Sequence, residues 1–397
     1  MTNNQDLTRA LWRPYVDADF VGRLRAFVAD RVAPHGDAID RDDVYPVEIV
    51  KALAAEGYNT IALDPQWGGG GLSYAHAVAA FEEISVGSAA VGISMITIMQ
   101  AQTMIRLFGA DSLKQRYLPR MREGLLCSYA LTEAGHGSDI RTLDTKARRD
   151  GDEWVITGEK HFITSGAAAE FFIILAETDV GVSAFAVPRD VPNLTAYEGH
   201  NSATFGLRNG PHMNIRLDGV RLPLDHLIGT EGKGVRQAVT VLDHSRTLAG
   251  AISLGIARAA FEGALAFARD RVAFDQTVLG FQGIQWYFAD MLTEIDAARL
   301  LCYRAADALD RHEDIARYSS EAKLKACAVA TEVASRAVQI CGAYGTMENN
   351  PFGRYLRDAK AYEIAGGSAE VLKNTIGKHL LREVAPRPAP AVPEVRS

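Results

Sequence analysis

The spacing of hydrophobic residues divides the chain into a helical start, a strand-forming middle and a helical end. Residues 15–33 place large apolar side chains at helical spacing, namely Phe20, Leu24, Phe27 and Val28. Further helices are predicted over 47–56, over 74–107 with a break near Gly87, and over 111–123. The four glycines at 68–71 lack the Lys-Ser/Thr that completes a phosphate-binding loop, so they are interpreted as a flexible connector.

From Leu125 the hydrophobic period becomes that of strands. Asp150-Gly151 predicts a hairpin, because this pair adopts the positive φ angles of a tight turn. Short apolar runs continue to about residue 218. Four to seven short strands of this kind would form a small antiparallel barrel or sandwich.

Beyond Gly234 the chain is rich in Ala and Leu, and the helical period returns. Helices are predicted over 236–273, 280–311, 314–341 and 367–383, which together indicate an antiparallel four-helix bundle. The fold class expected is α+β, mainly α. Its parts are an N-terminal helical domain 1–124, a middle β-domain 125–235, a bundle 236–385 and a proline-rich disordered tail 386–397.

The length, net charge and cysteine content of the chain argue against several classes of function. A length of 397 residues predicts two or three domains, and a net charge of -7 argues against nucleic-acid binding and a polybasic membrane patch. Four cysteines without CxxC spacing indicate reduced core thiols in a cytoplasmic protein and no metal-binding motif. The start of the chain shows no apparent secretory signal, and the most apolar segment, Ala89–Met99, is too short to span a bilayer.

Five motifs in order resemble the acyl-CoA dehydrogenase family over about residues 15–385. They are YALTEAGHGSD at 129–139, TGEKHFITSG at 157–166, LDGVRLPLDHLIG at 217–229, ARDRVAFDQTVLGFQGIQ at 268–285 and RDAKAYEIAGGSAE at 357–370. The resemblance implies a helical, β and four-helix-bundle order of domains, in agreement with the hydrophobic pattern. It also implies FAD as cofactor and a homotetramer or homodimer in which subunits complete one another's flavin sites.

The first two motifs supply the flavin-facing residues that the resemblance implies. Tyr129, Leu131 and Thr132 match a strand along the flavin ring, while Gly137 and Ser138 match a loop at the flavin phosphates and the substrate. Phe162 stands where the family commonly has Trp, and Ile163 and Thr164 match residues that face the ring. In the family their backbone and hydroxyl groups face the ring, and a hydrogen bond at the flavin N5 edge would stabilise the reduced anion.

A second group matches the part of the family's FAD site that a neighbouring subunit provides. Arg271 matches an arginine that reaches the FAD pyrophosphate, which suits a forked guanidinium, although a solvated helix-face arginine is the alternative. Further cofactor neighbours are implied at Phe274, Gln282, Gln339 and Ser368.

Asp243 and Arg246 match the pair that the family places near the CoA part of its thioester substrate. Three residues apart on a helix, they share one face, so an intrahelical ion pair is the alternative reading. A carrier-protein thioester would serve equally, because it has the same phosphopantetheine arm.

The chain departs from the family at the catalytic base. Family dehydrogenases remove an α-proton with a glutamate, and the matching position here is Gly366; a minority place the glutamate where this chain has Ser245. Neither residue offers a group whose pKa suits a general base. Replacements considered are His136, which could instead cap its loop, His244, which helical geometry favours as solvent-facing, and Glu363.

The missing glutamate favours an oxygen-using oxygenase or hydroxylase over simple α,β-desaturation. In that case dioxygen and a reductase are partners. The alternatives are a dehydrogenase with a relocated base, for which the resemblance implies an electron-transfer flavoprotein as acceptor, and a flavin- or CoA-binding protein without catalysis. Glu82 and Glu83 are expected to be packing or ion-pair residues.

Overall fold

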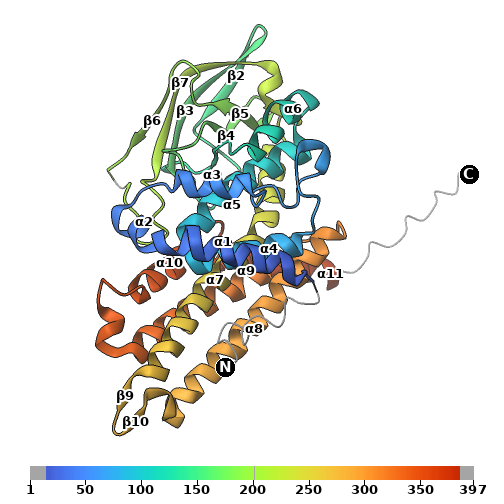
Figure 1. Cartoon of the computed structure of the whole chain (residues 1–397). Coiled ribbons are helices and arrows are strands. Elements are labelled where there is room, and N and C mark those ends of the chain that lie inside the picture. The colour runs from blue at the N-terminus through green and yellow to red at the C-terminus, as the bar shows by residue number, and fades with distance from the viewer. Residues whose placement is uncertain (1–14, 201, 385–397) are drawn as a thin grey trace, which may run out of the picture.

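A computed structural model describes residues 15–200 and 202–384, so the expected tail at 386–397 and the first 14 residues lie outside the described part. The strands form one end of the molecule, the N-terminal helices lie across the middle, and the long C-terminal helices extend away at the other end (Figure 1). The predicted α-β-α order is confirmed.

The N-terminal helices follow the hydrophobic pattern closely. They are α1 Ala18–Phe27, continued by a π-helical turn over Val28–Val32, then α2 Gly36–Asp42, α3 Val47–Ala55, α4 Tyr74–Gly87, α5 Ala89–Phe108 and α6 Asp111–Arg122. The break near Gly87 is confirmed, because α4 ends there and Ser88 caps α5 by accepting a hydrogen bond from Val91 N–H. The short helix α2 was not predicted.

The expectation of a flexible connector at 68–71 is wrong. The N–H groups of Gly69, Gly70 and Gly71 each donate to a backbone carbonyl between residues 60 and 64. A Cβ at Gly69 would lie 2.0 Å from the carbonyl oxygen of Leu63, so the chain approaches too closely for any side chain. The glycines therefore form a fixed turn.

The apolar helix α5 extends beyond its most apolar stretch, Ala89–Met99, and ends one residue after the predicted helix end at 107. Both α5, with 20 residues, and α7, Gly234–Asp270, are long and apolar enough to cross a membrane by composition alone. In each helix 78% of the most apolar window is buried inside the protein. Both are thus accounted for as core helices.

The middle domain contains one eight-stranded sheet in the order β6-β7-β3-β2-β4-β5-β8, with β1 beside β4. The strands are β1 Cys127–Ala130, β2 Lys146–Asp150, β3 Glu153–Ile163, β4 Phe171–Thr178, β5 Gly181–Pro188, β6 Leu194–Glu198, β7 Met213–Pro223 and β8 Leu227–Ile228. The predicted hairpin at Asp150-Gly151 joins β2 and β3. The sheet is not wholly antiparallel, because β1 and the start of β2 run parallel to β4.

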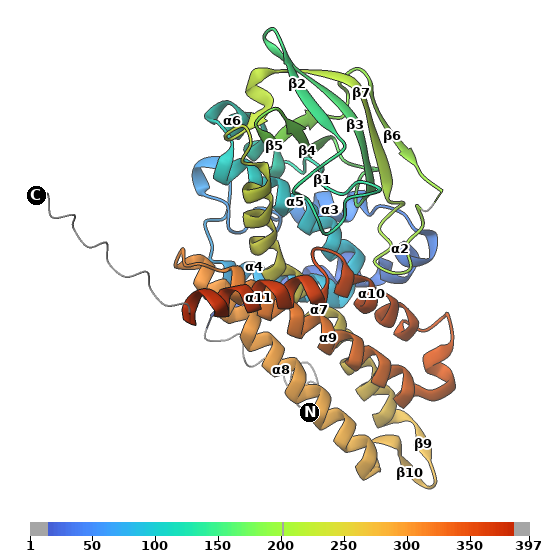
Figure 2. The same cartoon turned by 180° about the vertical axis from the view of Figure 1, so that it is seen from behind.

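One edge of β4 is shared by two strands. β1 pairs with its first half, at Phe171 to Ile174, and β2 meets it only at Glu177. The segment 131–145 leaves the sheet where β1 ends and returns where β2 begins. The glycine-containing first motif therefore emerges from a split in the sheet, close to the helical layer (Figure 2).

The C-terminal part consists of α7 Gly234–Asp270, α8 Gln282–Asp310, α9 Ala316–Cys341, α10 Phe352–Ile364 and α11 Ala369–Val384. The four predicted helices are present, and α10, which was not predicted, packs on α7 and α9. Short strands β9 Val272–Ala273 and β10 Gln276–Thr277 form a hairpin at the far tip between α7 and α8 (Figure 1). All four cysteines are free and buried, as expected.

A buried cluster of charges joins the N-terminal layer to the bundle. Arg258 of α7 donates to Glu82 and to Glu83 of α4, both at 2.7 Å, and Arg299 of α8 donates to Glu82 at 2.9 Å. Arg258 and Arg299 are fully buried. The ion-pair role expected for Glu82 and Glu83 is confirmed, and burial, which would raise their pKa values, is outweighed by the arginines, so both are lowered.

Candidate active site

The first two motifs meet at the split in the sheet. His161 N–H donates to the carbonyl of Thr132 at 2.9 Å, and Ser128 Oγ donates to the carbonyl of Thr164 at 2.6 Å. Tyr129, between these contacts, holds a buried hydroxyl without a hydrogen-bond partner among the described residues. The structure thus brings Tyr129 and Thr132 of the first motif together with Thr164 of the second.

A buried ion pair fixes the loop 131–145. Glu133 Oε1 accepts from Lys160 Nζ of β3 at 2.6 Å, and both side chains are almost fully buried. The same carboxylate accepts the N–H groups of Asp144 and Thr145 at 2.6 and 3.1 Å. Burial lowers the pKa of Lys160 to about 8, and Glu133 opposes that shift. Sequence reasoning missed this pair, although Lys160 lies inside the second motif.

His136 stands within this loop and belongs to its scaffold. Its backbone exchanges two hydrogen bonds with Glu133, at 3.0 and 3.1 Å, and its Nε2 lies 3.5 Å from Asp144 Oδ1. The loop-capping alternative is therefore the one observed. Glu133, His136 and Asp144 bring three ligand atoms together, but Lys160 already supplies a cation to Glu133, so the group needs no metal.

The last residues of β3 present an aromatic side chain outward. Phe162 has φ +58 and is 51% exposed, whereas the next residue, Ile163, is buried. An exposed aromatic on a residue with positive φ is unusual, and such backbone persists where the surroundings hold it in place. Thr164 follows, half-buried, with its Oγ1 3.3 Å from His212 Nε2. His212 was not predicted as a site residue.

His212 ends a loop, 202–212, that contacts all three parts of the molecule. Gly210 N–H donates to Asp43 after α2 at 3.1 Å, Asn209 Nδ2 donates to Ser94 Oγ of α5 at 2.9 Å, and Leu207 N–H donates to Asp358 of α10 at 2.6 Å. These anchors fix the position at which the chain enters β7. No sequence motif signalled the arrangement, since the anchors are far apart in the chain.

Asp243 and Arg246 form the ion pair of the alternative reading, at 2.7 Å, and both are buried in α7. Arg246 Nε also lies 3.5 Å from the carbonyl of Gly366, at the edge of hydrogen-bond reach. The predicted substrate pair and Gly366, the position predicted to match the family's glutamate, are thus adjacent. Burial raises the pKa of Asp243 to about 6, although Arg246 opposes this.

The turn between α10 and α11 contains Gly366 and Gly367, with φ +70 and +111. Lys323 of α9, fully buried, holds this turn by donating to the carbonyls of Tyr362 at 3.1 Å and Gly367 at 2.8 Å. A Cβ added at Gly366 would meet only Lys323 Cε within 4 Å of it, at 3.8 Å, among the described residues. Gly366 therefore borders open space at the position predicted from the sequence to match the family's base.

The other replacement bases are engaged elsewhere. His244 does not point into solvent as expected. Its ring is half-buried, packs edge-on against Tyr74 with centroids 5.9 Å apart and meets the carbonyl of Thr240 through Nδ1 at 2.9 Å. Burial lowers the pKa of His244 to about 4. Glu363 accepts from Thr331 Oγ1 and from Lys360 Nζ, so its carboxylate faces α9 and the neighbouring turn of α10.

The second predicted group lies apart from the first within one chain. Arg271 caps α7, and Phe274, 91% exposed, belongs to the adjoining hairpin. Gln282 and Gln339 are exposed near the same ends of α8 and α9. The β9–β10 hairpin projects from the end of the bundle opposite the sheet (Figure 2). Ser368, by contrast, lies beside Gly367, in the turn near Arg246.

The described residues fit FAD in their chemistry. The split sheet offers the half-exposed ring of Phe162, the hydroxyls of Thr132 and Ser138, and the unpartnered phenol of Tyr129. At Gly137 a Cβ would meet nothing within 4 Å, so the backbone stands open to a ligand. Arg271, among the described residues, has no carboxylate partner and only the ring of Tyr344 at 5.8 Å, which leaves its guanidinium available to phosphate.

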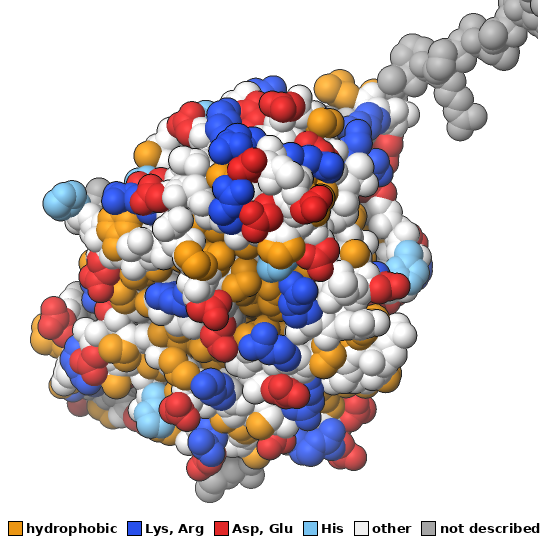
Figure 3. Space-filling model, turned by 90° about the horizontal axis from the view of Figure 1, so that it is seen from above, with side chains coloured by type: hydrophobic (Ala, Val, Ile, Leu, Met, Phe, Trp, Pro, Cys, Tyr) orange, Lys and Arg blue, Asp and Glu red, His pale blue; other side chains and the backbone are white. Residues whose placement is uncertain are grey.

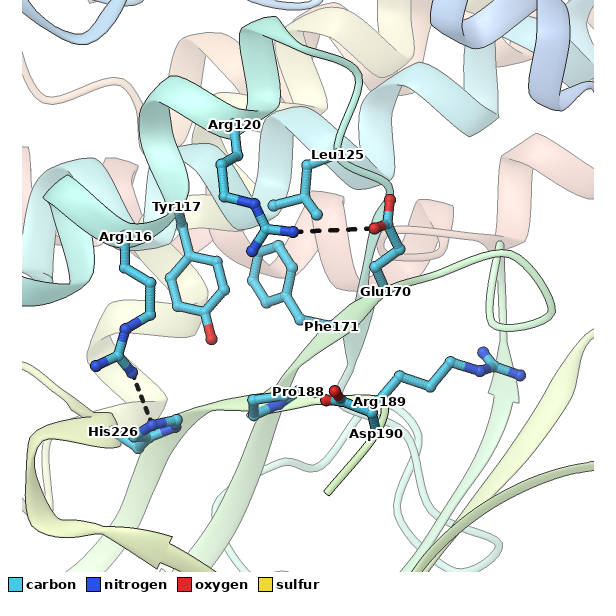
Figure 4. A pocket seen from close by; sticks show the side chains of 10 residues that line it. All are labelled: Arg116, Tyr117, Arg120, Leu125, Glu170, Phe171, Pro188, Arg189, Asp190 and His226. Carbon is cyan, nitrogen blue, oxygen red and sulfur yellow. Dashed lines mark hydrogen bonds and ion pairs between the residues drawn. The ribbon is translucent and has the colours of Figure 1, made fainter. Parts of the chain in front are cut away.

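A separate hollow lies between α6 and strands β4 and β5. Seen from the sheet end, apolar side chains gather in a hollow ringed by charged ones (Figure 3). A cavity of about 650 Å³ is lined there by Tyr117 stacked on Phe171, with Arg116 bonded to His226 at 2.8 Å and Arg120 paired with Glu170 at 4.0 Å (Figure 4). Its lining includes none of the predicted site residues, and those charges are already paired.

Comparison with known proteins agrees with this geometry. The sequence patterns of the acyl-CoA dehydrogenase N-terminal, middle and C-terminal domains match residues 17–125, 128–220 and 232–381. A probable acyl-CoA dehydrogenase of Mycobacterium leprae is 34% identical over 367 residues, covering 90% of this chain and 94% of the relative.

Solved structures extend the likeness. Butyryl-CoA dehydrogenase from Megasphaera elsdenii superposes with a TM-score of 0.89 at 31% identity, covering 96% of this chain and 100% of that one. A glutaryl-CoA dehydrogenase from Mycobacterium smegmatis, solved in complex with FADH2, superposes with a TM-score of 0.87 at 26% identity, covering 97% and 98%. The chain therefore belongs to the acyl-CoA dehydrogenase family and is an FAD-binding oxidoreductase.

Proposed function

We propose that this enzyme acts on an acyl-CoA or carrier-protein thioester and that it incorporates oxygen from dioxygen rather than performing simple α,β-desaturation. The observation that carries the proposal is Gly366, because the position of the family's base has neither a carboxylate nor any other side chain. Ser245, at the alternative position, is buried and hydrogen-bonded to Gln100 and to its own helix. A hydroxyl in that state is not a base at neutral pH.

The chain's own residues have distinct tasks in this proposal. Arg246 and Asp243 bind the thioester arm, and Lys323 keeps the turn at Gly366 in place through two carbonyls. Thr164 orients the flavin edge, and Phe162 shields the ring from water. When bound, FAD supplies the two-electron chemistry and the activation of dioxygen. The reaction consumes two electrons and two protons, placing one oxygen atom in the substrate and releasing the other as water, with a reductase or reduced nicotinamide as donor.

A dehydrogenase is the second candidate, because the relatives reported above are named dehydrogenases. The residue best suited to replace the glutamate is then Asp243. Its carboxylate is next to Arg246, and burial raises its pKa to about 6, close to the value that suits a general base at neutral pH. The acceptor of electrons would be an electron-transfer flavoprotein.

The deciding experiment mixes the purified enzyme anaerobically with aliphatic and aromatic acyl-CoAs while the oxidised-flavin absorbance is followed. We expect no bleaching, and a product that gains oxygen once chemically reduced enzyme meets dioxygen. Bleaching with formation of an enoyl thioester would overturn the oxygenase proposal. Asp243→Asn would then lose the reaction if Asp243 is the relocated base.

Two substitutions that add a carboxylate also test whether the site lacks only a base. Ser245→Glu and Gly366→Glu each place a carboxylate where the family has one, and either should create anaerobic desaturation in a site that otherwise lacks only the base. Ser245 lies in regular helix α7, whereas Gly366 has φ +70, which costs a non-glycine residue about 1–2 kcal/mol. The matched control is Ser245→Gln, which has the same size without the base.

We also propose that the functional unit is a homotetramer or homodimer. The separation of Arg271, Phe274, Gln282 and Gln339 from the split sheet supports this, because one chain alone cannot bring both groups to one cofactor (Figure 1). Mass determination in solution tests the proposal, and a monomer that retains FAD would contradict it.

A further inference from the structure

The hydroxyl of Thr164 has a neighbour that the sequence motifs do not explain. His212 Nε2 lies 3.3 Å from Thr164 Oγ1, although the two residues are 48 positions apart. A distance of 3.3 Å is slightly long for a hydrogen bond, but such bonds at active sites often tighten only when the ligand is bound. The pair therefore merits a functional reading.

The loop that carries His212 is held too firmly for the contact to be incidental. The backbone N–H of His212 donates to the carbonyl of Ser202 at 2.9 Å. Asp43, Ser94 and Asp358, from three different elements, accept hydrogen bonds from residues that lie between Ser202 and His212. Leu207, Asn209 and Gly210, which make those bonds, are all buried. The position of the imidazole is thus set by contacts with several parts of the fold. Residues that support a site residue through a hydrogen bond are usually fixed in this way.

The ring is neutral at physiological pH. Burial lowers the pKa of His212, and the charge that faces it, Asp43, opposes that shift only in part. A neutral imidazole has one nitrogen that accepts a hydrogen bond and one that donates. With its proton on Nδ1, His212 accepts from Thr164 through Nε2.

A threonine hydroxyl has a single proton to give. Beside an oxidised flavin, Thr164 can donate that proton to the ring edge. When the ring edge itself bears a hydrogen, Thr164 must accept, and its own proton needs another acceptor. We propose that His212 is a positioning residue whose Nε2 accepts the Thr164 hydroxyl proton when the flavin is reduced, and that it thereby raises the potential of the bound cofactor.

The inference rests on the proposed place of Thr164 at the flavin, and on no particular substrate. The test is the midpoint potential of the holoenzyme and of two variants, His212→Leu, which removes the acceptor, and His212→Gln, which retains an acceptor oxygen. A typical hydrogen bond corresponds to roughly a twofold to tenfold change in an equilibrium. We expect His212→Leu to lower the potential by up to about 30 mV, which is tenfold for a two-electron couple, and His212→Gln to restore most of it.

The decisive comparison repeats His212→Leu in a Thr164→Val background. If His212 acts through the hydroxyl, the two variants are not additive, and His212→Leu has no further effect once Thr164 is changed. An equal shift in both backgrounds, or an unchanged potential in His212→Leu with full FAD content, would overturn the proposal. If His212→Leu no longer binds FAD, the test rests on His212→Gln. A midpoint potential in His212→Gln that is clearly below that of the wild type would then overturn the proposal.

Two controls separate the proposed role of His212 from the placement of Thr164 at the flavin and from the oxygenase proposal. His200→Gln, on the exposed loop that follows β6, should leave the potential unchanged. If Thr164→Val alone has no effect on the potential, then the placement of Thr164 at the flavin is wrong, which is a different failure from that of His212. Failure of the oxygenase proposal would leave these measurements unaffected, because none of them uses substrate.

Discussion

The two groups of cofactor residues differ in how the chain holds them. At the split sheet, the loop and turn are fixed by the buried Glu133–Lys160 pair and by the bond between Thr132 and His161. At the bundle tip, Arg271 caps α7 and Phe274 belongs to the adjoining short hairpin, and both are exposed. The predicted residues at the split sheet are thus held by contacts within the chain, whereas those at the bundle tip would need a second subunit if the proposed oligomer forms. Substitutions that disrupt the split sheet should unfold the middle domain, whereas substitutions at the bundle tip should only weaken FAD binding.

The largest effect is expected from Lys160→Met. It leaves the buried carboxylate of Glu133 without its cation, and removing one partner of a buried pair costs about 3–5 kcal/mol. Chemical unfolding should show this loss together with a strong fall in FAD affinity. The matched control is Lys146→Met on the neighbouring strand, whose exposed pair with Glu177 is worth less than about 1 kcal/mol. Equal losses in the two variants would show that the loop is not fixed by this pair.

Asp358→Asn should change how stability depends on pH. Burial raises the pKa of Asp358 to about 6, against 3.8 when unfolded, although Arg354 opposes the shift. Between these values the native state holds a proton that the unfolded state has lost, so this group's contribution to stability falls as pH rises from about 4 to about 6. The asparagine keeps an acceptor for Leu207 N–H and removes the titration.

The measurement for Asp358 is the free energy of unfolding of both proteins from pH 4 to pH 7. Relative to the wild type, Asp358→Asn should gain up to about 3 kcal/mol across this range. A constant difference between the two proteins would mean that the carboxyl titrates normally.

Arg271→Ala tests the bundle tip. Because Arg271 is exposed, its loss should change the stability of the fold by no more than about 0.5 kcal/mol. A charge-assisted contact to a phosphate is worth about 1.5–3 kcal/mol, so FAD affinity should fall roughly tenfold to a hundredfold. Arg269→Ala is the matched control, since Arg269 is exposed on the same helix end and pairs with Asp270. Unchanged FAD affinity in Arg271→Ala would remove it from the cofactor site.

The smallest effect on stability is expected from Phe274→Ser. The side chain is 91% exposed, so the fold of one chain loses little apolar contact. If the hairpin meets a second subunit, the mass in solution should shift toward smaller assemblies at low protein concentration. A mass identical to that of the wild type would place the interface elsewhere.

Much of this architecture could be predicted from the sequence, and the failures have physical causes. The break near Gly87 and the hairpin at Asp150-Gly151 were predictable because local chemistry decides them. The glycines at 68–71 were misread because the turn that they form with the carbonyls of residues 60–64 has no signature in the residue pattern. The helix α10 was missed although, at 13 residues, it is longer than α3 and α6, which were predicted.

The candidate site divides in the same way. Thr164 could be named because it lies in a motif, and Arg246 because it matches a residue that the family places near CoA; the predicted loss of the base at Gly366 rests on the motif at 357–370. His212, Lys323 and the partner of Lys160 could not be named, since each acts through a contact between distant segments. His244 was misplaced because Tyr74, on another helix, covers it. Sequence motifs thus identified the residues expected to touch cofactor and substrate but not those that support them.

The buried charges between α4 and the bundle have a consequence for how the molecule can be divided. Glu82 pairs only with arginines of α7 and α8 among the described residues, whereas Glu83 also has Arg25 of α1. A fragment that ends before α7 would therefore leave Glu82, which is buried in the whole protein, without either of its arginines. Chimaeras between relatives should exchange α4 together with α7 and α8.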